Sequence, residues 1–398
     1  MMARVRRDAG IYVHVPYCLR KCRYCDFASV AIDRDAIPMS AYVDAVLKEG
    51  RLRAAAIGNT YEFTSIYLGG GTPSLLAPAS VRRLLGGLKD AFGVQAHAEV
   101  TLECNPSSLD AAKASELVRC GVTRLSVGVQ STVDSNLALL GRIHDAATGR
   151  RALQAALASG ATRVSADVII GLPGQTPAQA VHDVCEVASI GPGHLSVYLL
   201  TIEPGTALAS ALARGQVPPI DEGQAADAYQ GVSDALTQLG FDHYEVSSHA
   251  RAGQRSAHNT AVWSGGVYVG LGPGAVGMME DRSGAVRYRN DPDPQAYMQA
   301  LKRVNGLPWN IAGGPVQWVE ELDAGTRMRE RIMLGLRVAE GVDLGALEQE
   351  LGVAGWTDRR RRAARWLQAR GRVVVEGDRI RIPRRAWLWE ADTVARLL

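Results

Sequence analysis

Short apolar runs alternate with amphipathic stretches over the first 220 residues of the chain. The apolar runs lie between turn residues, which is typical of buried strands, and they are Ile11–Val15, Ser65–Leu68, Glu99–Glu103, Arg124–Val129, Arg163–Ile170 and His194–Leu200. The stretches between them repeat apolar residues at helical spacing and are Ser40–Ala56, Val81–Phe92, Ala111–Arg119, Thr148–Ala158 and Ala178–Ala188. Strands that alternate with helices predict an α/β fold with parallel strands, and this many units predict a whole or partial (β/α) barrel.

The pattern changes after residue 220. Residues 221–305 indicate a helix, a short strand at Tyr244–Val246 and Gly-rich loops, which we interpret as an extension that completes the barrel of residues 1–220. Residues 306–325 are predicted to be a linker. Residues 326–398 predict a small domain that resembles a winged helix, with helices near Thr326–Arg337, Leu344–Leu351 and Asp358–Arg370 and a hairpin of Arg372–Val375 and Arg379–Ile382.

Composition and charge argue against a nucleic-acid-binding, membrane-spanning or secreted protein. The chain has 398 residues and 47% hydrophobic content, which suits a globular protein with a large core. The net charge of +3 gives no reason to expect a nucleic-acid partner, and the run Arg359–Arg362 indicates a solvated helix face. No apolar run approaches the roughly 20 residues that span a membrane, and the first residues lack the apolar segment of a signal peptide. With six sparse cysteines, we expect a protein of the reducing cytoplasm.

Three cysteines near the N-terminus carry the clearest chemistry. Cys18, Cys22 and Cys25 have the spacing C-x3-C-x2-C, and three thiolates on one loop can hold three irons of a 4Fe–4S cluster. The next cysteine is Cys104, so the fourth iron would be open to a small molecule. A zinc-bound structural module is the alternative, with His14 as its fourth ligand, although His14 lies in a strand-like run. A redox pair of Cys22 and Cys25 would leave Cys18 unexplained.

Polar residues stand at or near the ends of the predicted strands. The second strand is followed by the Gly-rich turn Gly69–Ser74, whose backbone can approach a ligand closely. Further polar residues in these places are Glu103, Gln130, Arg142 and Asp167. Two carboxylates, an amide and a guanidinium suit a zwitterionic ligand that carries a ribose. The literal G-x-G-x-x-G of Gly272–Gly277 opens no helix, so we reject a dinucleotide fold there.

These motifs together resemble one family. The segments Tyr12–Pro16, Cys18–Cys25, Gly69–Pro73, Val127–Gln130, Asp167–Thr176 and Tyr198–Thr206 are similar to radical S-adenosylmethionine (SAM) proteins of the anaerobic coproporphyrinogen oxidase family. The resemblance implies a partial (β/α) barrel of the radical SAM type, a 4Fe–4S cluster on the three cysteines, and SAM chelated to the open iron. It implies that SAM is contacted by Tyr12, Tyr24, Gly70, Gly71, Thr72, Glu103, Gln130, Arg142 and Asp167. An electron donor such as flavodoxin or ferredoxin would then serve SAM cleavage.

The residue two places after the third cysteine distinguishes two subgroups of this family. Porphyrinogen dehydrogenases carry a fourth cysteine there and a longer N-terminal arm, whereas this chain has Phe27 and an early Cys18. The chain therefore resembles the HemW-type subgroup, which implies a haem chaperone that binds haem and passes it to an unidentified acceptor protein. An acceptor at the membrane would bring the chaperone to the membrane surface. The alternatives are a coproporphyrinogen III dehydrogenase and a radical SAM methyltransferase, so enzymatic activity stays open.

The haem site is less clearly marked than the cluster site. The subgroup's usual histidine after Gly-Pro-Gly is absent, because the chain reads Ala275-Val-Gly277 at that place. Among the eight histidines, His258 is the candidate haem ligand, because it lies near Trp263 in a Gly-rich loop region.

Overall fold

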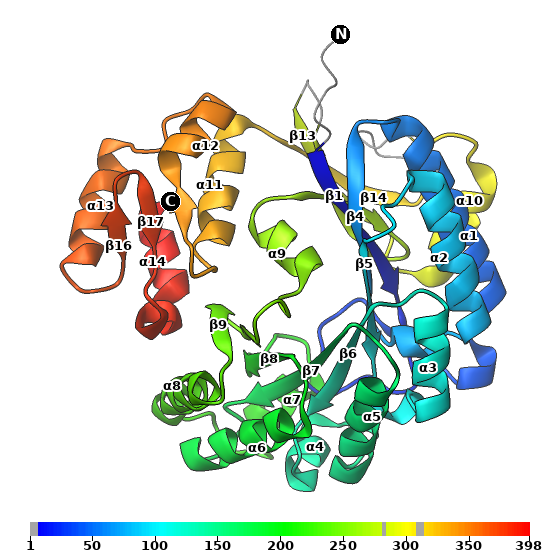
Figure 1. The fold of residues 1–398 in the computed structure, drawn as a ribbon, viewed down its shortest axis with the longest axis horizontal. Coiled ribbons are helices and arrows are strands. Elements are labelled where there is room, and N and C mark those ends of the chain that lie inside the picture. The colour runs from blue at the N-terminus through cyan, green and yellow to red at the C-terminus, as the bar shows by residue number, and fades with distance from the viewer. Residues whose placement is uncertain (1–6, 281–283, 308–313) are drawn as a thin grey trace.

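One mixed sheet of twelve strands organises the larger part of the molecule (Figure 1). The structure is a computed structural model that describes residues 7–280, 284–307 and 314–398. Seven neighbouring strands are parallel, in the order β11 (Val267–Leu271), β1 (Arg7–Val15), β4 (Tyr61–Gly70), β5 (Glu99–Cys104), β6 (Arg124–Gln130), β7 (Arg163–Ile170) and β8 (His194–Leu199). The strand order is linear, with antiparallel strands at both ends, so the predicted partial (β/α) barrel is confirmed.

Helices cover the outer face of this sheet (Figure 1). They are α1 (Met39–Ile57), α2 (Pro78–Phe92), α3 (Ala111–Arg119), α5 (Ala146–Ala158), α6 (Pro177–Ile190) and α8 (Glu222–Gln238). Helix α2 shows why they pack this way, because Val81, Leu84, Leu85 and Leu88 are buried on one side. Each such side chain stabilises the fold by roughly 1.5–3 kcal/mol. The core lies between these helices and the sheet. Two short helices, α4 (Asp134–Leu140) and α7 (Ala207–Ala213), pack in a separate apolar cluster with Ile169 and Leu200, near the ends of β7 and β8.

The predicted strands and long helices agree closely with the structure. Strand β7 and helix α3 have the predicted bounds, and β4 begins four residues before the predicted Ser65. Helices α4, α7 and α9 (Ala257–Trp263) were not predicted. Each has seven residues, which is too short for an apolar period to stand out from the flanking turns.

The two ends of the sheet differ most from the sequence interpretation. Strands β12 (Val276–Glu280), β13 (Ala285–Asn290) and β14 (Val316–Leu322) follow β11, and β10 (Ser248–Ala250) and β9 (Asp242–Glu245) follow β8. Strand β14 lies within the predicted linker 306–325 and pairs with β13, so the prediction of a linker is wrong for the residues of β14. Residues 308–313 of the predicted linker lie outside the described residues. Helix α10 (Pro294–Arg303) packs beside α1. The proposed domain boundaries stay predictions.

The C-terminal residues form the predicted winged-helix-like domain. It contains α11 (Ala324–Gly335), α12 (Leu344–Leu351), α13 (Asp358–Gln368) and α14 (Glu390–Leu397), with the three-stranded sheet of β15 (Val342–Asp343), β17 (Arg379–Arg381) and β16 (Val374–Glu376). It contacts the barrel through Arg337, whose Nη2 lies 3.0 Å from Oε2 of Glu245 on β9. Arg360 of the predicted solvated run is instead buried and donates to three backbone carbonyls.

Candidate functional site

The cysteine loop begins directly after the first strand of the barrel. A short parallel pair, β2 (Tyr17–Cys18) and β3 (Val30–Ala31), closes the base of the loop. The middle of the loop is fixed by backbone hydrogen bonds, since Arg23 N–H donates to the Leu140 carbonyl at 3.0 Å and Leu208 N–H donates to the Arg23 carbonyl at 2.7 Å. The loop is therefore held by two distant parts of the chain, the end of α4 and the start of α7.

Hydrogen-bond donors approach the cysteine sulfurs. Thr72 Oγ1 lies 3.4 Å from Sγ of Cys18, and Arg142 Nη1 lies 3.4 Å from Sγ of Cys22. Burial raises the pKa of the Cys18 and Cys25 thiols. An iron–sulfur cluster held by these sulfurs would bind them as thiolates. Within the described residues, no three Cys, His, Asp or Glu side chains converge tightly enough for a single metal ion.

A cavity of about 380 Å³ lies between the cysteine loop and the carboxyl ends of the strands. It brings together eleven of the thirteen predicted site residues: Cys18, Cys22, Tyr24, Cys25, Gly70, Gly71, Thr72, Glu103, Gln130, Arg142 and Asp167. These residues come from the cysteine loop, from β4 to β7 with the turn after β4, and, for Arg142, from the segment after α4. They gather at the carboxyl ends of the strands, which is the end of a (β/α) barrel where ligands bind. Tyr12 and His258 do not line this cavity.

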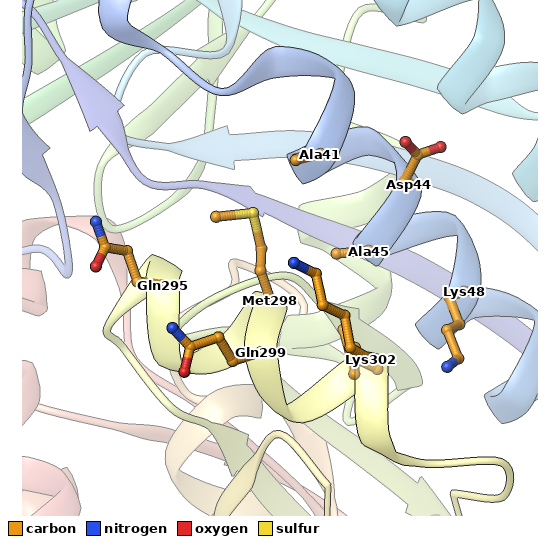
Figure 2. Close-up of a pocket in the computed structure, with 9 residues that line it drawn as sticks. Ala41, Asp44, Ala45, Lys48, Gln295, Met298, Gln299 and Lys302 are labelled. Atoms are coloured by element: carbon orange, nitrogen blue, oxygen red, sulfur yellow. The ribbon is translucent and has the colours of Figure 1, made fainter.

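A second cavity of about 510 Å³ lies between α1 and α10 (Figure 2). Its walls are Ala41, Asp44, Ala45 and Lys48 of α1 and Gln295, Met298, Gln299, Leu301 and Lys302 of α10. None of the predicted site residues lines it, and it contains neither cysteine nor histidine. The candidate site is therefore the cavity at the cysteine loop.

The Gly-rich turn is shaped by the chain behind it. Gly71 N–H donates to the Val15 carbonyl at 2.7 Å, and a Cβ on Gly71 would lie 2.8–2.9 Å from backbone atoms of residues 15–17. Gly70 has φ +110°, and a Cβ there would lie 2.6 Å from the His14 ring. The absence of side chains thus lets the turn press against the start of the cysteine loop.

Two half-buried carboxyl groups face the cavity. Glu103 accepts hydrogen bonds from Tyr67 Oη at 2.7 Å and from Gly70 N–H at 3.1 Å. Burial, with Asp167 nearby, raises the pKa of Glu103 to about 7. Asp167 accepts from Ser126 Oγ at 3.3 Å, and burial raises its pKa as well. Two carboxyl groups whose negative charge is poorly compensated favour a cationic ligand.

Gln130 and Arg142 present polar atoms that lack a protein partner. Gln130 is the only non-glycine residue with positive φ in the described chain, at 66°, and its buried Oε1 makes no hydrogen bond. Arg142 donates from Nη2 to the Gly128 carbonyl at 3.0 Å, but its buried Nε is unpaired. Buried polar atoms without partners, together with backbone strain, mark a place where a polar ligand completes the structure.

Known proteins resemble both parts of the chain. Residues 12–184 match the Radical SAM superfamily, and residues 322–389 match the HemN C-terminal domain. Heme chaperone HemW of Mycobacterium tuberculosis (strain ATCC 25618 / H37Rv) is 34% identical over 390 residues, covering 98% of this chain and 94% of that protein. Heme chaperone HemW of Escherichia coli (strain K12) is 35% identical over 293 residues, covering 73% and 75%. The chain belongs to the HemW group of the radical SAM superfamily.

A solved structure supports the same fold. The radical SAM enzyme coproporphyrinogen III oxidase (HemN) from Escherichia coli superposes with a TM-score of 0.82 and 23% identity, covering 98% of this chain and 90% of that one. Membership of the superfamily implies a 4Fe–4S cluster and SAM as cofactors. The three cysteines with adjacent donors suit the cluster, and the unpaired atoms of Gln130 and Arg142 beside two carboxyl groups suit SAM.

Tyr12 lies behind the cysteine loop of this HemW-group protein. Its hydroxyl is 2.9 Å from His14 Nδ1, and His14 Nε2 is 2.8 Å from the Ala28 carbonyl. The pair therefore supports the end of the loop. The predicted contact between Tyr12 and SAM stays a prediction, since Tyr12 is outside the cavity lining.

His258 is packed inside the barrel wall. Its Nδ1 lies 2.9 Å from Ser65 Oγ, its backbone N–H donates to Glu99 Oε1 at 3.1 Å, and burial lowers its pKa to about 4. The role of His258 as haem ligand stays a prediction, and His258 is not among the residues that line the cavity.

The sequence interpretation did not name the residues at the mouth of the cavity as site residues, and it used Phe27 only to distinguish the two subgroups. The lining includes the apolar side chains of Phe27, Tyr198 and Leu199 and the cationic side chains of Arg20 and Lys21. Tyr198 and Leu199 end β8, so their place at the carboxyl edge of the sheet was a signal that could have been used.

Proposed function

We propose that this protein binds haem and delivers it to an acceptor protein, and that it carries a 4Fe–4S cluster and SAM in the cavity at the cysteine loop. The observation that carries the proposal is the similarity to haem chaperones over 98% of the chain. Phe27 supports it, because this side chain lines the cavity two places after Cys25, where the dehydrogenases have a cysteine.

The side chains of the cavity divide into two groups in this proposal. Cys18, Cys22 and Cys25 hold the cluster. The turn of Gly70, Gly71 and Thr72, with Glu103, Gln130, Arg142 and Asp167, binds SAM, and Tyr24 closes the cavity beside Arg142. When bound, the two cofactors supply one-electron reductive cleavage of SAM. Glu103 and Asp167 hold the cationic part of the ligand, and the free Gln130 Oε1 accepts a hydrogen bond from it.

The proposed partners are haem, a haem acceptor and an electron donor such as flavodoxin or ferredoxin. A cytoplasmic location is part of the proposal, and it is supported by the six cysteines, none of which is paired in a disulfide. Among the described helices, none has the length and apolarity needed to cross a membrane.

Oxidation of coproporphyrinogen III is the second candidate function. The TM-score of 0.82 to coproporphyrinogen III oxidase favours it at the level of the fold. Phe27 argues against it, because phenylalanine cannot supply the additional thiol of the dehydrogenases. The methyltransferase alternative gains no support from the relatives described above.

One experiment separates the candidates. Protein reconstituted anaerobically with iron and sulfide is titrated with haem, and the Soret band is followed. The chaperone proposal expects saturable binding of haem, transfer of that haem to an apo-haemoprotein, and no loss of coproporphyrinogen III under reducing conditions with SAM. Formation of protoporphyrinogen would favour the enzyme. Absence of both haem binding and porphyrinogen turnover would contradict both candidates.

A further inference from the structure

We propose that haem lies across the mouth of the cluster cavity, with one porphyrin face on an apolar rim formed by Phe27, Tyr198 and Leu199. The proposal rests on the haem-binding function and names where that function takes place. It differs from the expectation that His258 holds the haem.

The three rim side chains are unusually exposed for apolar residues. Phe27 is 61% exposed, Tyr198 45% and Leu199 36%. The exposed part of Tyr198 faces the cavity, because this side chain lies near Asp167 and Ser196. Phe27 is the most exposed of the eleven large hydrophobic residues on the surface of the described chain. An exposed aromatic ring gains no hydrophobic stabilisation until a partner covers it. These residues therefore provide binding free energy for an apolar ligand.

The rim is assembled by the fold. Phe27 follows the cysteine loop, while Tyr198 and Leu199 end β8, yet all three line one cavity. Ile169 and Leu200, which are almost fully buried, line the same cavity behind them. A rim built from two distant segments, with apolar side chains beneath it, is a prepared surface for a flat, apolar ligand.

Cations stand beside the rim. Arg20 Nη2 donates to the carbonyls of Gly141 at 3.2 Å and Arg142 at 2.6 Å, and Lys21 Nζ donates to the Phe27 carbonyl at 3.3 Å. Neither cation forms an ion pair with a carboxylate in the described part of the chain. Haem is a flat ring with two carboxylates at one edge, so this combination of apolar surface and fixed cations matches its chemistry.

Two acidic residues define the orientation of the ligand. Asp26 and Glu203 also line the cavity. They would repel the haem carboxylates, so these point toward Arg20 and Lys21. The inner part of the cavity, with Glu103 and Asp167, is polar and is reserved for SAM in the proposed function. Haem therefore covers the mouth and does not enter the interior.

The rim supplies no histidine or methionine to the iron. Neither residue type occurs among the side chains that line the cavity, and the proposal assigns Tyr198 to the porphyrin face with no bond from its oxygen to the iron. Binding through the porphyrin face therefore predicts that protoporphyrin IX, which lacks iron, binds within a few-fold of the haem affinity. A site based on an axial histidine would distinguish strongly between the two ligands.

The test uses cluster-loaded protein with haem and with protoporphyrin IX. Phe27→Ala should weaken binding of both by roughly tenfold, because the ring loses most of its contact area. Phe27→Tyr keeps the ring and should stay close to wild type. Trp318→Ala is the matched control, since Trp318 is 44% exposed but does not line the cavity. Iron and sulfide content must be equal in all variants, which shows that the loop is intact.

The outcomes separate this inference from the function on which it rests. Unchanged affinity of Phe27→Ala for both ligands, in protein that binds haem normally, would overturn the rim alone. Loss of haem binding without loss of protoporphyrin binding in His258→Ala would also overturn it and would place the haem at the histidine. Failure of the wild-type protein to bind haem would overturn the chaperone function and the rim together.

Discussion

Two carboxylates in this molecule, Glu49 and Glu103, differ in burial and in their hydrogen bonds, since Glu103 is half-buried at the wall of the cavity. Glu49 on α1 is fully buried and accepts from Asn290 Nδ2 at 2.9 Å, Gly272 N–H at 3.0 Å and Tyr297 Oη at 2.6 Å. Arg53 Nη2 lies 3.4 Å from the same group. Glu103 accepts only two such bonds, and its neighbours in the cavity include unpaired polar atoms.

The difference teaches which polar cluster is structural and which is functional. The carboxylate of Glu49 is satisfied by the protein itself and joins α1 to β13, to α10 and to the loop after β11. The cluster at Glu103 is incomplete until a ligand arrives. Unpaired polar atoms alone do not make this distinction, because Arg53 Nε and Nη1 and Asn290 Oδ1 beside Glu49 also lack partners. What separates the two carboxylates is that Glu103 lines a cavity and accepts fewer hydrogen bonds.

The largest expected effect is loss of the cluster. Cys22→Ser should abolish the iron–sulfur absorbance, because one of three thiolate ligands is removed and no other cysteine belongs to the loop. SAM binding should fall with it. The measurement is iron and sulfide content together with the visible spectrum after anaerobic reconstitution.

Cys104→Ala is the control for this prediction. Cys104 lines the cavity, but it is buried, and its Sγ lies 3.6 Å from the Leu102 carbonyl. The variant should keep its cluster. If it loses iron as Cys22→Ser does, the assignment of three protein ligands is wrong.

The second effect is on stability and concerns Glu49, whose carboxylate is hydrogen-bonded by the protein itself. Glu49→Ala should lower the free energy of unfolding by about 3–5 kcal/mol, because the buried Arg53 loses its counter-ion. Denaturant unfolding gives this value. Glu103→Gln is the matched comparison in the incomplete cluster, and it should not destabilise the protein. A carboxyl whose folded pKa is raised costs stability above its unfolded pKa, so its removal relieves this cost.

The third effect is on SAM affinity and on its pH dependence. With a pKa of about 7, Glu103 is mostly protonated at pH 6 and mostly charged at pH 8. A cationic ligand prefers the charged form, so SAM affinity should rise with pH across this window, by up to about tenfold. Calorimetry of wild type and Glu103→Gln at both pH values measures it. A rise of equal size in both proteins would show that the SAM amino group, and not Glu103, is responsible.

The sequence predicts the parts of this molecule in which a local pattern determines the structure. The parallel strands follow from apolar runs, and the strand ends place Glu103, Gln130 and Asp167 in one cavity. The positions of β12 to β14 depend on pairing between distant segments, which no local period reveals. His258 looked like a ligand because of its glycine-rich surroundings, but only the packing shows that it faces Ser65.

The smallest predicted effect tests the strain at Gln130. Its φ of 66° is unfavourable for a side chain with a Cβ, whereas glycine adopts it freely. Gln130→Gly should therefore raise the free energy of unfolding by up to about 1 kcal/mol, while SAM binding weakens because the amide is lost. Denaturant unfolding and calorimetry on the same preparation give both values. A variant that loses stability and keeps SAM affinity would show that the Gln130 amide serves the fold, and the incomplete cluster would then need another explanation.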